Sequence, residues 1–214
     1  MPTVRFTPAD RLLLALDRVL RLAPPPGRTA ATDPCAELPE TSELSPAERQ
    51  HAAALMRVNH AGELAAQGLY LGQSLGARSP LVLAQLQAAS AEEADHIDWC
   101  RARLQALGSR RSVLDPVWFG GALVIGVVAG TAGDDWSMGF VAETERQVQA
   151  HLDDHLGRLP SADRRSRAVL EQMRRDEIRH GEDARRAGGR ELPAPLRSLM
   201  RLASKLMTRT AYRL

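Results

Sequence analysis

Two short stretches, Glu93-Ala94-Asp95-His96 and Glu177-Ile178-Arg179-His180, decide the fold of this chain. Each pairs a Glu with a His three residues later, and a helix brings positions i and i+3 to the same face. A further Glu precedes each pair by a similar interval: Glu63 lies 30 residues before the first pair's Glu, and Glu145 lies 32 residues before the second's. Such a set is how a four-helix bundle holds two iron or manganese ions. The pattern predicts an all-α, ferritin-like four-helix bundle.

Start and stop signals predict four long helices. Ser45-Pro46-Ala47-Glu48 combines an N-cap Ser, a Pro at the first helical position and a capping-box Glu, and Ser79-Pro80 repeats the start signal. Gly188-Gly189 marks the end of the last helix. The expected ranges are about 45–75, 79–108, 134–156 and 161–188. One long connection then separates two helix pairs, as a ferritin-like bundle requires.

The chain divides at about residue 44. Residues 45–214 hold all four helices and are expected to form the metal-binding domain. Residues 1–44 contain an amphipathic segment and a Pro-rich linker, and we expect them to be peripheral to the core. Cys35 is expected in an exposed loop and Cys100 in the core, both as thiols. The net charge of +2 gives no reason to expect a nucleic-acid partner.

The connection between the helix pairs is apolar. Residues 116–133 carry no charge over 18 residues and include five glycines. That length is at the lower edge of the roughly 17–25 residues that span a bilayer. The glycines argue against a span, and we expect a crossover helix that is either buried in the core or dips into a membrane.

The C-terminal stretch 193–213 predicts a basic amphipathic helix. Basic side chains recur every four residues at Arg197, Arg201, Lys205, Arg209 and Arg213, beside an apolar side rich in Leu and Met. Such helices lie on anionic membrane surfaces. The alternative is a terminal helix that docks on the bundle with a solvated Arg stripe. Because the apolar crossover accompanies it, peripheral membrane contact is the preferred interpretation.

The ligand types also indicate the metal. Carboxylate oxygens and imidazoles suit iron or manganese better than zinc, whose structural sites contain more sulfur and nitrogen. Without a cation, four inward carboxylates repel one another and their pKa values rise. A metal site is therefore the best interpretation of the six side chains together, although Fe and Mn are not distinguished by ligand type.

Four motifs resemble those of the demethoxyubiquinone hydroxylases, membrane-associated di-iron monooxygenases of ubiquinone biosynthesis. They are Met56-Arg57-Val58-Asn59-His60-Ala61-Gly62-Glu63, Glu92-Glu93-Ala94-Asp95-His96, Ala142-Glu143-Thr144-Glu145 and Asp176-Glu177-Ile178-Arg179-His180. The resemblance covers roughly residues 45–214. It implies two Fe ions per chain, bound by Glu63, Glu93 and His96 and by Glu145, Glu177 and His180, with Glu93 and Glu177 placed to bridge both.

The resemblance also implies a function. The expected reaction is O2-dependent hydroxylation of the ring of a demethoxyubiquinol, with a polyprenyl quinol as substrate. The expected location is the cytoplasmic face of the cell membrane, with peripheral attachment and with other ubiquinone-biosynthesis proteins as partners. No catalytic residue beyond the metal ligands is expected. Iron storage by a ferritin relative and a non-catalytic membrane adaptor are the alternatives, but the apolar crossover fits the first poorly and the six ligand-type residues have no purpose in the second.

Several positions stay open. Glu143 competes with Glu145 for the third-helix ligand, and the interval from Glu63 favours Glu145 only weakly. His60, one turn before Glu63, is either a hydrogen-bond partner of the site or an idle helix residue. His151 is either near the substrate or on the surface. Asp176 is an outer-shell candidate, as are Asp95 and Arg179.

Overall fold

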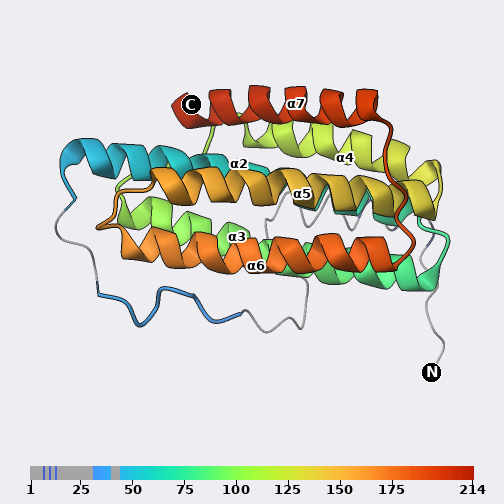
Figure 1. The fold of residues 1–214 in the computed structure, drawn as a ribbon, viewed down its shortest axis with the longest axis horizontal. Helices are drawn as coiled ribbons and strands as arrows, with labels where there is room; N and C mark the ends of the chain where they lie inside the picture. The colour runs from blue at the N-terminus through green and yellow to red at the C-terminus, as the bar shows by residue number, and fades with distance from the viewer. Residues whose placement is uncertain (1–6, 8–9, 11–12, 14–30, 40–43) are drawn as a thin grey trace.

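The computed structural model describes residue 7, residue 10, residue 13, residues 31–39 and residues 44–214. In this part of the chain all regular structure is helical (Figure 1). The helices are α2 (Pro46–Gly76), α3 (Pro80–Ala106), α4 (Asp115–Thr131), α5 (Asp134–Arg158), α6 (Arg164–Arg186) and α7 (Ala194–Arg213). The predicted all-α class is confirmed. The predicted amphipathic segment near the N-terminus lies, except for single residues, outside the described residues.

Helices α2, α3, α5 and α6 form the bundle. α2 packs along α3 and α5 packs along α6, while contacts between α3 and α6 and between α2 and α5 join the two pairs. Large apolar side chains fill the space between the pairs at one end; they include Leu55, Met56, Leu104, Leu152 and Met173. All five are at most 2% exposed. This packing holds the four helix faces that carry Glu and His at fixed positions.

The helix starts follow the sequence signals with one exception. Ser45 and Glu48 form the expected reciprocal capping box at the start of α2. The last bundle helix was expected from Ser161, but α6 begins at Arg164 with Asp163 as its N-cap. The carboxylate of Asp163 accepts hydrogen bonds from the backbone of Ser166 and from the guanidinium of Arg103, at 3.0 and 3.1 Å. The buried ion pair of Asp163 and Arg103 therefore fixes the start of α6 at a later residue than the local signal at Ser161 suggests.

Helix α4 is the apolar crossover, and glycines seat it on α2. A Cβ atom added at Gly68 of α2 would lie 2.5 Å from the carbonyl oxygen of Phe119. Added at Gly130 of α4, it would lie 2.7 Å from the carbonyl oxygen of Gln73. The two backbones therefore approach so closely that these positions have no space for a side chain. Within the apolar segment, Gly126 and Gly130 serve this helix packing, whereas a Cβ added at Gly120 or Gly121 would meet no heavy atom within 4 Å.

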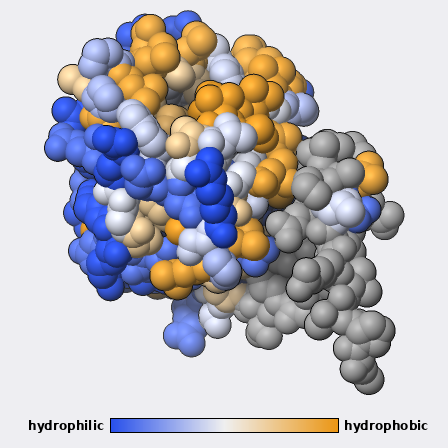
Figure 2. All heavy atoms as spheres, turned by 90° about the vertical axis from the view of Figure 1, so that its right-hand side faces the viewer, coloured by the Kyte–Doolittle hydropathy of each residue, from blue (hydrophilic) through white to orange (hydrophobic). Residues whose placement is uncertain are grey.

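The other face of α4 and the outer face of α7 expose apolar side chains. On α4 these are Val117, Val124, Ile125 and Val128, and on α7 they are Leu199, Leu202 and Leu206, with 45–65% of each side chain exposed. Figure 2 shows hydrophobic surface at the top of the molecule, where Figure 1 places these two helices. The crossover is thus half packed and half exposed. No helix in the described ranges is long and apolar enough to cross a membrane.

Residues 31–39 form a strap across α3 and α6. The backbone N–H of Ala31 donates to the Asp95 carboxylate at 3.1 Å, and Arg165 donates to the carbonyl oxygen of Cys35 at 3.2 Å. The prediction of an exposed Cys35 is wrong, because its side chain is 2% exposed and belongs to the bundle core. A turn stabilised by Asp33, whose carboxylate accepts from the backbone N–H of Cys35, directs the thiol inward. Cys35 and Cys100 are both free thiols.

Candidate metal centre

The six predicted ligand residues come together inside the bundle. α2 supplies Glu63, α3 supplies Glu93 and His96, α5 supplies Glu145, and α6 supplies Glu177 and His180. Two overlapping groups have ligand atoms that all lie within 4.8 Å of one another: Glu63, Glu93, His96 and Glu177, and Glu93, Glu145, Glu177 and His180. Only Glu93 and Glu177 belong to both groups. The geometry thus offers two adjacent ion positions that share two carboxylates.

Both histidines direct the same ring atom at the carboxylates. Nδ1 of His96 lies 3.1 Å from Glu93 and 3.4 Å from Glu177. Nδ1 of His180 lies 3.4 Å from Glu93 and 3.7 Å from Glu177. Each imidazole therefore spans the same two acids from opposite sides. This is the arrangement expected when one nitrogen of each ring is reserved for a cation.

The electrostatics of the cluster also favour a cation. All six side chains are buried, and both carboxylate oxygens of Glu145 lack a hydrogen-bond partner within the described part of the chain. Burial and the negative charge of Glu93 raise the pKa of Glu63, and burial and the charge of Glu177 raise the pKa of Glu145. The pKa values of Glu93 and Glu177 are lowered instead, against the effect of burial, through hydrogen bonds and the two histidines, so two of the four buried acids favour a bound proton and two favour the charged form. Burying four such acids together without a cation is costly. Divalent ions would replace those protons, so the residues fit a metal.

The other ring nitrogen of each histidine contacts a carboxylate from the opposite helix. Nε2 of His96 lies 3.2 Å from Asp176, and Nε2 of His180 lies 3.0 Å from Glu92. The His180 contact contributes most to lowering the pKa of Glu92 to about 2. Asp176 and Glu92 each come directly before a Glu of a Glu-x-x-His pair, and each acts on the histidine of the other pair. Such contacts fix ring orientation and the protonated nitrogen.

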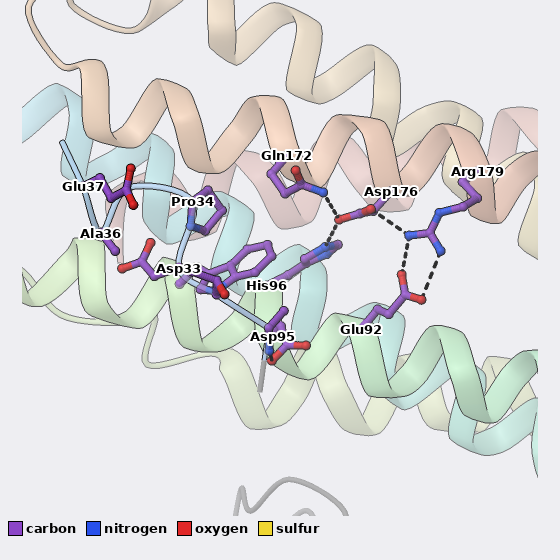
Figure 3. A pocket seen from close by; sticks show the side chains of 13 residues that line it. Asp33, Pro34, Ala36, Glu37, Glu92, Asp95, His96, Gln172, Asp176 and Arg179 are labelled. Carbon is purple, nitrogen blue, oxygen red and sulfur yellow. Dashed lines mark hydrogen bonds and ion pairs between the residues drawn. The ribbon is translucent and has the colours of Figure 1, made fainter. Parts of the chain in front are cut away.

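One guanidinium joins these two outer acids. Arg179 donates to Glu92 at 3.1 and 2.6 Å and to Asp176 at 2.7 Å (Figure 3). Asp176 also accepts from Gln172 at 3.0 Å. Burial alone would raise the pKa of Asp176, but the bonds from His96, Gln172 and Arg179 lower it to about 2. Both outer acids are therefore ionised, and a single side chain connects the supports of both histidines.

The structure places the residues whose roles the sequence left undecided in different surroundings. Glu145 is in the cluster, whereas Glu143 is bound by Arg146 at 2.7 and 2.8 Å, which with Gln147 lowers its pKa against the effect of burial. Nδ1 of His60 lies 3.2 Å from Asp115 at the start of α4. His60 belongs to neither ligand group among the described residues. His151 lines an apolar cavity.

Two cavities approach the cluster from opposite faces of the bundle. A polar one of about 620 Å³ lies between α3, α6 and the strap and reaches His96; its acidic lining includes Asp33, Glu92, Asp95 and Asp176 (Figure 3). An apolar one of about 360 Å³ lies between α2, α4, α5 and α7 and reaches Glu63; its lining includes Leu69, Trp118, Ile125, Phe140 and Met207. Charged groups and apolar molecules would thus meet the cluster from different sides.

A four-helix bundle with two helix pairs converging on buried Glu and His defines a class: the ferritin-like carboxylate–histidine proteins. The model of the family described as ubiquinone biosynthesis protein COQ7 matches residues 50–211. The chain belongs to this family. The resemblance drawn from its sequence motifs is confirmed.

Similar proteins cover nearly the whole chain. A Cupriavidus metallidurans protein is 56% identical over 206 residues, which are 96% of this chain and 100% of the relative. A Cupriavidus necator protein is 57% identical with the same coverage. A Ralstonia pickettii protein is 54% identical over 214 residues, 98% of this chain and 99% of its own. Each of these relatives is named 3-demethoxyubiquinol 3-hydroxylase.

One participant was missed by the sequence interpretation. Glu92 appeared there only as part of a motif, yet it contacts His180 and Arg179. The signal was present, because an acid precedes the Glu of both Glu-x-x-His pairs. A symmetric treatment of the two pairs would have placed Glu92 beside Asp176.

Proposed function

We propose that this protein hydroxylates the ring of 3-demethoxyubiquinol with O2 at a di-iron site. The observation that carries the proposal is the pair of ligand groups that share Glu93 and Glu177. The names of the similar proteins support the choice of substrate. The catalytic unit is residues 45–214, which include all the proposed ligands.

The ligands divide between two ions. Glu63 and His96 would hold one iron and Glu145 and His180 the other, while Glu93 and Glu177, which belong to both groups, would serve both ions. When bound, the iron supplies the ability to activate O2 for insertion of oxygen into a ring C–H bond. The protein's own contribution is to fix the ligands and to determine which molecules reach each side. Asp176 and Glu92 orient the imidazoles, and the strap covers the polar side.

The apolar cavity is the substrate site. Its wall includes Glu63, so a ring inside it lies beside a proposed ligand, while an apolar prenyl tail is accommodated by Leu69, Ile125 and Met207. His151 also lines this cavity. Burial lowers the pKa of His151 to about 4, so its ring is neutral at physiological pH. A neutral imidazole can exchange hydrogen bonds with a quinol without adding a charge to an apolar space.

The surface around this cavity supports contact with a membrane. Exposed Val124 and Val128 on α4 and exposed Leu202 and Leu206 on α7 lie on the two helices that wall the cavity. Arginines and a lysine accompany the leucines along α7. We infer peripheral attachment to the cytoplasmic face of the cell membrane through residues 116–133 and 193–213. Other proteins of ubiquinone biosynthesis remain proposed partners.

Anaerobic reconstitution tests the proposal. The protein is loaded with Fe(II), the iron per chain is counted, and O2 is added with a reductant and a demethoxyubiquinol. The expected result is about two irons per chain and a hydroxylated ring. Glu145→Gln should lose iron and product, while the matched variant Glu143→Gln should retain both. Loading far beyond two irons per chain would favour an iron-storage function. Absence of product from fully loaded protein would refute the proposed hydroxylase activity.

A further inference from the structure

An amide in the wall of the apolar cavity has half of its hydrogen-bonding capacity unused. Asn59 lines the cavity and is 2% exposed. Its Oδ1 lies 2.9 Å from Nδ1 of His155, but its Nδ2 has no hydrogen-bond partner among the described residues. Buried side-chain donors are nearly always paired, and an unpaired one costs about 1–3 kcal/mol. The amino group of Asn59 therefore lacks an acceptor at the place where a ligand would lie.

His155 fixes which end of this amide faces the cavity. The side-chain oxygen of Asn59 can only accept, so Nδ1 of His155 must carry the proton and donate it. Burial, together with the nearby His151, lowers the pKa of His155 to about 2, and the ring is neutral. The ring of His151 packs against it with a centroid separation of 3.8 Å. With Oδ1 engaged in this way, the two N–H groups of Asn59 are left for a ligand.

The ligand must then present an acceptor in an otherwise apolar space. Val58, Ala66 and Val148 line the cavity and offer a ring only apolar contact. Trp118 and His151 also line it, and Nε1 of Trp118 and Nε2 of His151 have no hydrogen-bond partner among the described residues. Among the groups of a prenylated quinone or quinol, only the ring oxygens and the methoxy oxygen accept hydrogen bonds. Among these polar groups the amide of Asn59 is the one that a second side chain, His155, holds in place, and it matches the oxygen-bearing head of an otherwise hydrocarbon molecule.

We propose that Asn59 is a specificity-determining residue that donates a hydrogen bond to a ring oxygen of the aromatic substrate. Asn59 lies one helical turn before Glu63, and both line the cavity. An oxygen held by Asn59 therefore places the ring next to a proposed metal ligand and sets which ring edge faces the cluster. This role rests on the proposed function, because it presumes that the cavity receives the quinol head.

The test uses a demethoxyubiquinone with a short prenyl tail and the same prenylated ring without its oxygens. Binding to the full-length, Fe(II)-loaded protein without O2 is measured by calorimetry for wild type, Asn59→Leu and the control Gln105→Leu, which replaces an exposed amide on α3 outside the cavity lining. Asn59→Leu should weaken quinone binding about three- to tenfold and leave binding of the oxygen-free ring unchanged or tighter. Gln105→Leu should change neither by more than about twofold. Equal loss of both probes would count against a hydrogen bond to oxygen.

Infrared difference spectra of the bound quinone give an answer that does not depend on the stability of a variant. In wild-type protein one carbonyl stretch should shift to lower frequency than in the free quinone, and the shift should vanish in Asn59→Leu. An unshifted carbonyl in wild type, or a shift that persists in the variant, overturns the role of Asn59. Quinone that does not bind at all overturns the proposed function instead, and product formation by wild type tests that function separately.

Discussion

The two faces of the candidate metal cluster differ in the hydrogen-bond partners of their histidines. On the α3/α6 face, His96 and His180 each contact an ionised acid, and Arg179 joins those acids. On the α2/α5 face, His155 is buried and His151 is half-buried, and neither has an acidic hydrogen-bond partner among the described residues. Burial lowers their pKa values to about 4 for His151 and about 2 for His155. One bundle thus keeps charge on one side of the cluster and excludes it from the other.

This difference separates two requirements of the proposed reaction. Metal ligands must be oriented, which ionised partners do well because charge-assisted hydrogen bonds are short and directional. A lipid substrate must enter without facing unpaired charge, which would cost free energy in an apolar cavity. A change confined to one face should therefore leave the properties of the other face unaffected.

Removing a shared ligand should have the largest effect. Glu177 belongs to both ligand groups, so Glu177→Ala should prevent stable binding at both ion positions and reduce hydroxylation to background. Iron per chain and product formation are the measurements. The apolar face should be unaffected, so the metal-free variant should bind a short-tailed demethoxyubiquinone as the metal-free wild type does. Retention of two irons by the variant would contradict the assigned ligand set.

Changing the outer acids should have the next largest effect and should separate the two ion positions. Asp176→Asn should weaken the site that contains His96, and Glu92→Gln the site that contains His180, because each acid contacts one ring. Arg179→Met should weaken both, since it binds both acids. Losses of such supporting contacts typically reduce metal affinity about 10- to 100-fold.

Cobalt(II) titration followed by visible absorption is a suitable measurement, because it reports coordination without turnover. Arg174→Met on the same helix is a matched control, since Arg174 is paired with Asp153 away from the cluster. Identical losses at both sites in the Asp176 and Glu92 variants would show that the two supports are not independent. If the Arg179 variant bound cobalt(II) with wild-type affinity at both ion positions, Arg179 would not connect the two supporting acids.

The sequence predicted these two faces to different extents. The ligand set could be predicted because the helix repeat alone places i and i+3 on one face, and the cluster contains all six expected residues. The contact between Glu92 and His180 joins residues 88 apart on different helices, so the repeated acid before each Glu-x-x-His pair marks Glu92 as a candidate but does not show which side chain it contacts. The apolar cavity depends on how α4 and α7 lie on α2, and the close approach at Gly68 and Gly130 determines the position of α4. The inward thiol of Cys35 likewise follows from tertiary packing that a Pro-rich composition does not report.

The apolar face should govern membrane binding. Replacing Leu199, Leu202 and Leu206 with Ser removes three side chains that are 58–65% exposed on α7. Sedimentation with anionic lipid vesicles should show about tenfold weaker binding or more, because burial of each leucine in lipid contributes of the order of 1 kcal/mol. Leu81→Ser on α3, also 65% exposed, is the matched control and should change nothing. Metal content should be unchanged in both, and equal vesicle binding by the triple variant would contradict the assigned surface.

The smallest predicted effect is a pH dependence of stability that belongs to the apolar face. An unfolded histidine titrates near pH 6.5, whereas His151 and His155 in the fold have pKa values of about 4 and about 2. Between these values the unfolded chain binds more protons than the fold, so stability falls as the pH drops below about 6.5. From pH 7 to pH 6 the two residues together should reduce the free energy of unfolding by about 1 kcal/mol. The free energy of unfolding in urea is measured at several pH values for the metal-free wild type and for the metal-free His151→Gln, His155→Gln double variant. The two curves of this free energy against pH should converge toward acid. Parallel curves would mean that these rings are not held neutral by burial.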